Sequence, residues 1–83
     1  MMWRNVSVDK DAMVCMLIGI RDSHELDNND DAQELISTFE DELIKPDPAP
    51  MVIKNHLIRL KNIASNSGAN TSGKCIDEAL WML

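Results

Sequence analysis

The residues from Gly68 to Cys75 match the phosphate-binding pattern G-x-x-x-x-G-K, with Cys75 where the magnesium-binding Ser or Thr belongs. Such a loop cradles phosphates with its backbone N–H groups and follows a buried strand of a parallel sheet. Here the pattern follows a predicted helix, and a chain of 83 residues leaves no room for the nucleotide-binding fold. We therefore predict a flexible interhelical turn in which glycine supplies unusual backbone angles.

Two further sets of residues contain metal-binding side chains. The run Asp27–Asp31 resembles the start of a calcium loop, but Ala32 stands where that loop needs Gly and Thr38 where it needs Glu. Four possible zinc ligands lack the close spacing of a C-x-x-C site; they are Cys15, His24, His56 and Cys75. We predict a helix-capping cluster for the first set and packing roles for the second, and hence no metal or other cofactor.

Cys15 together with a histidine is the one arrangement that suggests nucleophilic catalysis. Cys15 lies in the apolar run from Ala12 to Ile20, so we predict a buried, unreactive thiol and no enzymatic activity. That run has nine residues, about half of what spans a bilayer. Residues 1–10 also lack the order of a signal peptide. We expect a cytoplasmic protein with reduced thiols and no membrane contact.

The charge of the chain is strongly asymmetric. The whole sequence has a net charge of -6, which excludes a nucleic-acid binder that depends on a basic face. Ten acidic residues and one Lys lie between Asp22 and Asp47, a net charge of -9, which leaves +3 for the rest. The length suits one small domain, residues 1–83, with a shallow core.

The apolar spacing predicts an all-α bundle of three to four short helices. The first spans about residues 7–24, although a buried strand over residues 13–20, paired with residues 3–8, is an alternative. Its inward positions are Met13, Met16, Leu17, Ile20 and His24.

A second helix follows Asp27–Asp31, capped by Asp30 or Asp31, and ends before Pro46. Its inward stripe is Ala32, Leu35, Ile36, Phe39 and Leu43, and its outward stripe is Asp30, Glu34, Ser37 and Asp41. The outward stripe is either a solvated surface or a surface shaped for a basic partner.

A third helix begins at Pro48–Pro50, where proline suits the first turn. Its inward stripe is Ile53, Leu57, Leu60 and Ala64. After a polar loop over residues 65–73, Thr71 or Ser72 caps a fourth helix that has Asp77 and Glu78 in its early turns. The inward positions of this helix are Ile76, Ala79, Leu80 and Leu83.

Several large apolar residues fall off these inward stripes: Val14, Ile18, Met51, Ile58 and Trp81. Exposed apolar groups of this extent are typical of interfaces. We therefore predict self-association, such as a homodimer through the first helix, or incorporation into a larger complex.

Three parts of the sequence together resemble a helical module found at the C-terminus of many bacterial conflict and defence proteins. They are Glu42–Pro48, the repeat Ile53-Lys-x-x-Leu57-x-x-Leu60-x-x-Ile63-Ala64, and Gly68-x-Asn70, and they cover about half the chain. The resemblance implies a bacterial or phage setting and an interaction role.

We therefore expect a small acidic protein that docks on a partner protein and inhibits, neutralises or tethers it. Immunity proteins, antitoxins, phage inhibitors and defence-system subunits are all of this type. The alternative is a self-associating regulatory or structural module without a dedicated basic partner. Binding that weakens steeply with salt would favour the first hypothesis.

Overall fold

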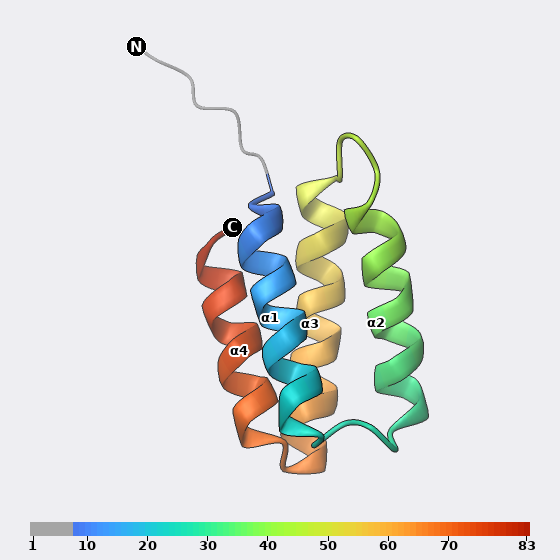
Figure 1. Ribbon diagram of the computed structural model, residues 1–83, viewed down its shortest axis with the longest axis vertical. Coiled ribbons are helices and arrows are strands. Elements are labelled where there is room, and N and C mark those ends of the chain that lie inside the picture. The colour runs from blue at the N-terminus through green and yellow to red at the C-terminus, as the bar shows by residue number, and fades with distance from the viewer. Residues whose placement is uncertain (1–7) are drawn as a thin grey trace.

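The computed structural model describes residues 8–83, which form four helices joined by short connections (Figure 1). The helices are α1 (Lys10–Ser23), α2 (Asp30–Leu43), α3 (Pro50–Ser67) and α4 (Asn70–Trp81). Consecutive helices run in opposite directions (Figure 1), as in an up-and-down bundle. The prediction of a small all-α bundle is confirmed, with four helices.

Residues 13–20 are helical within α1, so the alternative of a buried strand there is wrong. Asp9 caps the helix, because its carboxylate accepts the N–H of Ala12 at 3.1 Å. The predicted start at Ser7 lies outside the described residues. His24 follows the last turn with a left-handed φ of 59° and donates its N–H to the carbonyl of Arg21. A residue in this conformation cannot continue the helix, and this ends α1.

The start of α2 differs from the predicted one. Asn29 is the cap, and its Oδ1 accepts the N–H of Ala32 at 3.0 Å. Asp30 and Asp31 already belong to the first helical turn, where their negative charges interact favourably with the positive end of the helix dipole. The helix ends at Leu43, before Pro46, as predicted.

The polar loop predicted over residues 65–73 is much shorter in the structure. α3 begins at Pro50 and continues to Ser67, so only Gly68 and Ala69 separate it from α4. Gly68 has a φ of 71°, which glycine adopts without the steric penalty of a Cβ atom. Because α4 begins at Asn70, Asp77 and Glu78 lie in its second half rather than in its early turns.

Neither Thr71 nor Ser72 caps α4, because both lie inside the helix, and Ala69 at the cap position offers no side-chain bond. The carboxylate of Glu25, in the connection between α1 and α2, takes that role instead. It accepts the N–H of Ser72 at 2.8 Å and the N–H of Thr71 at 3.3 Å. The bond from Ser72 is the main cause of a lowered pKa at Glu25.

The four helices enclose one core. α1 packs on α4, α4 on α3, and α3 on α2. The side of α1 that faces α2 is joined to it by the Arg21–Glu40 ion pair at 2.9 Å. All the predicted inward residues of α1, α2 and α3 are buried except His24. On α4, Ile76 and Ala79 are buried, whereas Leu80 and Leu83 are only partly buried.

Candidate interaction surfaces

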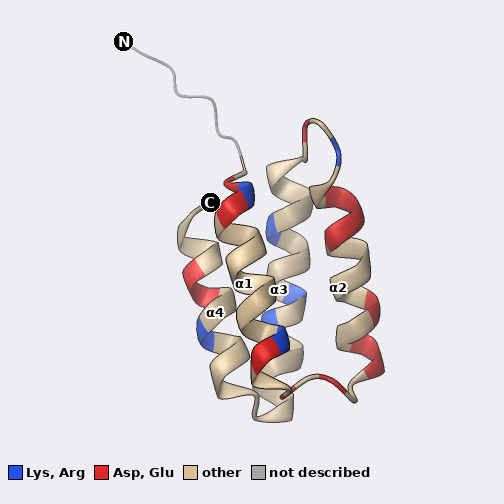
Figure 2. Cartoon of the chain, in the orientation of Figure 1, with Lys and Arg blue, Asp and Glu red and all other residues tan. Residues whose placement is uncertain are grey.

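The outward residues of α2 form an exposed acidic stripe, which consists of Asp30, Glu34, Ser37 and Asp41. Figure 2 shows acidic residues at several levels of this helix. The ion pairs among residues 8–83 are Arg21–Glu40, His24–Asp27, Lys45–Glu42 and Lys61–Asp77. None of these pairs includes an acid of the stripe, so its three carboxylates have no cationic partner within residues 8–83.

Val14 and Ile18 lie on the exposed side of α1, with exposed fractions of 46% and 52%. Val14 lies one turn before Ile18, and Ile18 lies one turn before Arg21, so the three side chains share one face of α1. Arg21 on this face pairs with Glu40 of α2. They therefore border the same side of the bundle as α2. An apolar edge and an acidic stripe thus lie on adjacent helices.

The other predicted apolar contacts lie on a different side, between α3 and α4. Lys61 of α3 pairs with Asp77 of α4 at 2.6 Å. Ile58 precedes Lys61 by three residues and Trp81 follows Asp77 by four. Because the two helices are antiparallel, Ile58 and Trp81 both lie about one turn from this pair in the same direction.

Met51 lies two turns further along α3, and Trp81 is the most exposed of the five residues, at 88%. The predicted apolar residues therefore occupy two surfaces rather than one. Ile44, which is 79% exposed, was not among them. Its place after the last turn of α2 removes it from the inward stripe.

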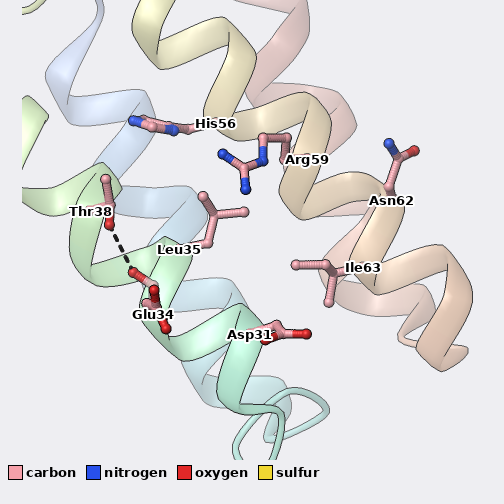
Figure 3. A pocket seen from close by; sticks show the side chains of 8 residues that line it. All are labelled: Asp31, Glu34, Leu35, Thr38, His56, Arg59, Asn62 and Ile63. Carbon is pink, nitrogen blue, oxygen red and sulfur yellow. Dashed lines mark hydrogen bonds between the residues drawn. The ribbon is translucent and has the colours of Figure 1, made fainter.

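A polar groove of about 540 Å³ runs between α2 and α3 (Figure 3). Asp31 and Glu34 line it from α2, and His56, Arg59 and Asn62 line it from α3. Its apolar lining residues are Leu35 and Ile63. The α3 side of this groove was not predicted from the sequence, although the three-residue spacing of its polar residues places them on one helix face.

His56 is half-buried in this groove, and its Nδ1 is buried with no hydrogen-bond partner among residues 8–83. This half-buried position agrees with the packing role predicted for His56. His24 is different, because it is exposed and bonds Asp27 at 2.7 Å instead of packing in the core. Its place after the last turn of α1 takes it off the inward stripe.

The two thiols lie together, away from both histidines. Cys15 and Cys75 line one pocket of about 250 Å³ between α1 and α4. Cys15 is exposed, so the prediction that it is buried is wrong. The run from Ala12 to Ile20 is apolar on every side of α1, so packing against the other helices decides which side faces the core. Cys75 is partly buried, and this burial raises the pKa of its thiol.

The other chemical patterns also take defined positions. Gly73, Lys74 and Cys75 lie within α4, so the G-x-x-x-x-G-K pattern does not form a loop. Residues 8–83 contain no group of three or more His, Cys, Asp or Glu side chains placed to hold a metal ion.

Within the same residues, no helix combines the length and apolar character needed to cross a bilayer. No protein-family model matches the chain, and no curated protein or solved structure is significantly similar to it.

Proposed function

We propose that this protein is a non-enzymatic binding module that docks on a basic partner protein and inhibits, neutralises or tethers it. The acidic stripe of α2 is the observation that supports this proposal. Its three carboxylates are exposed on one face of a helix and have no cationic partner within residues 8–83. A basic surface can approach them without breaking an internal ion pair, and their field accelerates the encounter.

Val14 and Ile18 supply the apolar part of the proposed docking surface. Charges alone contribute mainly to the association rate and to specificity, whereas buried apolar groups supply most of the affinity. A partner that lies across α1 and α2 contacts the acidic stripe and these two residues together. The two cysteines lie elsewhere, in the pocket between α1 and α4.

The resemblance to a module of bacterial conflict and defence proteins suggests the biological setting. A small acidic protein of the immunity, antitoxin, phage-inhibitor or defence-subunit type acts in the cytoplasm by binding one target.

The proposal is tested by reversing two acids of the stripe that do not line the α2–α3 groove. The Asp30→Lys/Asp41→Lys variant and the wild type are used to capture proteins from the native host for mass spectrometry. The matched control is Asp22→Lys/Glu78→Lys, which changes the net charge equally on α1 and α4. We expect the captured partner to bind the control like the wild type and the stripe variant at least about tenfold more weakly at low salt.

High salt should weaken wild-type binding and reduce the difference between the variants. A partner that binds the stripe variant with wild-type affinity at low salt would contradict the proposal. The stripe would then be only a solvated surface.

A further inference from the structure

The two walls of the α2–α3 groove carry opposite charges that are not paired with each other. Asp31 and Glu34 line it from α2, and Arg59 lines it from α3. None of the ion pairs among residues 8–83 includes any of these three side chains. Figure 3 shows the Arg59 side chain extending from α3 toward α2 in the groove. Each wall therefore has a charge that is available to a second molecule.

A second copy of this chain carries the complementary charges in the required order. Rotation by 180° about an axis parallel to the groove places α2 of one copy over α3 of the other. Because α2 and α3 run in opposite directions, Glu34 and Arg59 each lie near the middle of their wall of the groove. The rotation preserves the level of each residue along the helices, so Glu34 of one copy faces Arg59 of the other, and the same pair forms twice. An axis across the helices would instead place α2 on α2, acid against acid, which is unfavourable.

We infer that the α2–α3 groove is the interface of a symmetric homodimer, held by reciprocal pairing of Glu34 with Arg59. Leu35 and Ile63 line the groove with apolar atoms, which the second copy covers. The interface is self-complementary, as a two-fold axis requires. Glu34 belongs to both the acidic stripe and this interface, but the inference rests on its pairing with Arg59 of α3, and the docking test uses Asp30 and Asp41, which do not line the groove.

The geometry predicts a weak and salt-sensitive dimer. α2 has 14 residues and α3 has 18, which correspond to lengths of about 21 Å and 27 Å. Two short helices from each copy bury an area in the range of transient interfaces, below about 1,200 Å² in total. The pairs at its edge are exposed, so salt screens them effectively.

Sedimentation equilibrium of the full chain over a range of concentrations tests the inference. At low salt, the wild type should be in monomer–dimer equilibrium. We expect Arg59→Glu and Glu34→Lys each to weaken the dimer about tenfold or more, since each places like charges together twice. The two variants mixed in equal amounts should form a one-to-one heterodimer with about wild-type affinity, because the mixture restores both opposite-charge pairs.

Two controls change the charge by the same amounts outside the groove lining. Lys54→Glu matches Arg59→Glu, and Asp41→Lys matches Glu34→Lys. Both controls should dimerise like the wild type, within about threefold. Circular dichroism shows whether each variant is folded, and formation of the heterodimer itself requires that both are.

Three results would overturn the inference. They are a wild type that stays monomeric at low salt and high concentration, a dimer that tolerates both reversals, and a mixture of the two variants that remains monomeric. A monomer that still captures a basic partner through the acidic stripe would overturn the homodimer and leave the proposed function standing.

Discussion

α2 and α4 have similar lengths, but their N-termini are stabilised in different ways. The cap of α2 is Asn29, the residue directly before the helix. The N–H groups at the start of α4 bond the carboxylate of Glu25, which precedes Ser72 by 47 residues. The first helix is therefore started by its own neighbours in the sequence, and the second by a residue that only the folded bundle brings near.

The buried faces of the two helices also differ, and again α2 depends more on its own sequence than α4 does. α2 buries five apolar residues along one stripe. The buried positions of α4 include Ser72 and Gly73, which contribute little apolar surface. Packing against both α1 and α3 compensates for this weakness of α4. A helix of low intrinsic stability can therefore form where its neighbours supply the contacts.

The largest predicted effect on stability comes from a substitution on the inward face of α2. Phe39 is fully buried in the middle of this stripe. The change Phe39→Ala should lower the free energy of unfolding by about 3–5 kcal/mol, because it leaves a cavity in the core. Urea denaturation measures this loss. The exposed residue two positions earlier serves as a control, since Ser37→Ala should change stability by about 0.5 kcal/mol or less. Equal stabilities for the two variants would show that α2 does not pack through Phe39.

The local cap of α2 should have a smaller effect. The change Asn29→Ala removes the bond from the N–H of Ala32 and should destabilise the protein by about 1 kcal/mol. Thermal denaturation compares it with Asn28→Ala, which alters the exposed asparagine one residue earlier. If Asn28→Ala were the more harmful of the two changes, Asn29 would not be the cap.

Gly73 offers a way to strengthen α4 by itself. A Cβ atom there would lie 3.7 Å from the Cε of Lys61, an ordinary contact. Because glycine is unfavourable inside a helix, Gly73→Ala should raise the stability by about 0.5–1 kcal/mol. Gly68→Ala should have the opposite effect, since Gly68 has a φ of 71°. Chemical denaturation measures both changes, and a less stable Gly73→Ala variant would mean that α3 and α4 need the closer approach that glycine permits.

The remote cap of α4 should have the smallest effect on global stability, because Glu25 is exposed. The change Glu25→Gln should speed amide hydrogen exchange at Ser72 and leave Ala32 in α2 unaffected. Unchanged exchange at Ser72 would argue against a role for Glu25 at this helix start.

The same residue predicts a pH dependence with a defined sign. The pKa of Glu25 is lowered in the folded state from a reference value of 4.5, mainly by the N–H of Ser72. Its contribution to stability is therefore present above about pH 4.5 and is lost as the pH falls through the lowered pKa. The stability difference between wild type and Glu25→Gln should shrink between about pH 6 and about pH 3. A difference that grows over this range would contradict the assignment.

The comparison of α2 with α4 also explains which sequence predictions succeeded. The buried apolar residues of α2 and α3 were all identified, because an apolar stripe at helical spacing carries its own signal. The cap of α2 was missed by one residue, since several neighbouring Asn and Asp residues can all serve as caps. The bounds of α4 were missed by more, because Gly68 ends α3 and Glu25 stabilises the start of α4.

Some of the candidate surfaces were likewise predicted from the sequence, and one was not. The exposed acidic stripe and the exposed apolar residues were found because they lie opposite or beside clear inward stripes. The α2–α3 groove was not found as a unit. Its walls come from two helices, and no pattern within either helix states which residues of the other lie opposite it.

The sequence by itself thus determined the all-α fold, the inward faces of α2 and α3 and the acidic stripe of α2. These features depend on residues a few positions apart, and helical geometry is sufficient to place them. Only the tertiary structure decided the exposure of Cys15, the remote cap of α4 and the opposition of Arg59 to Glu34. Each of these depends on which helices become neighbours, and packing of the whole bundle sets that arrangement.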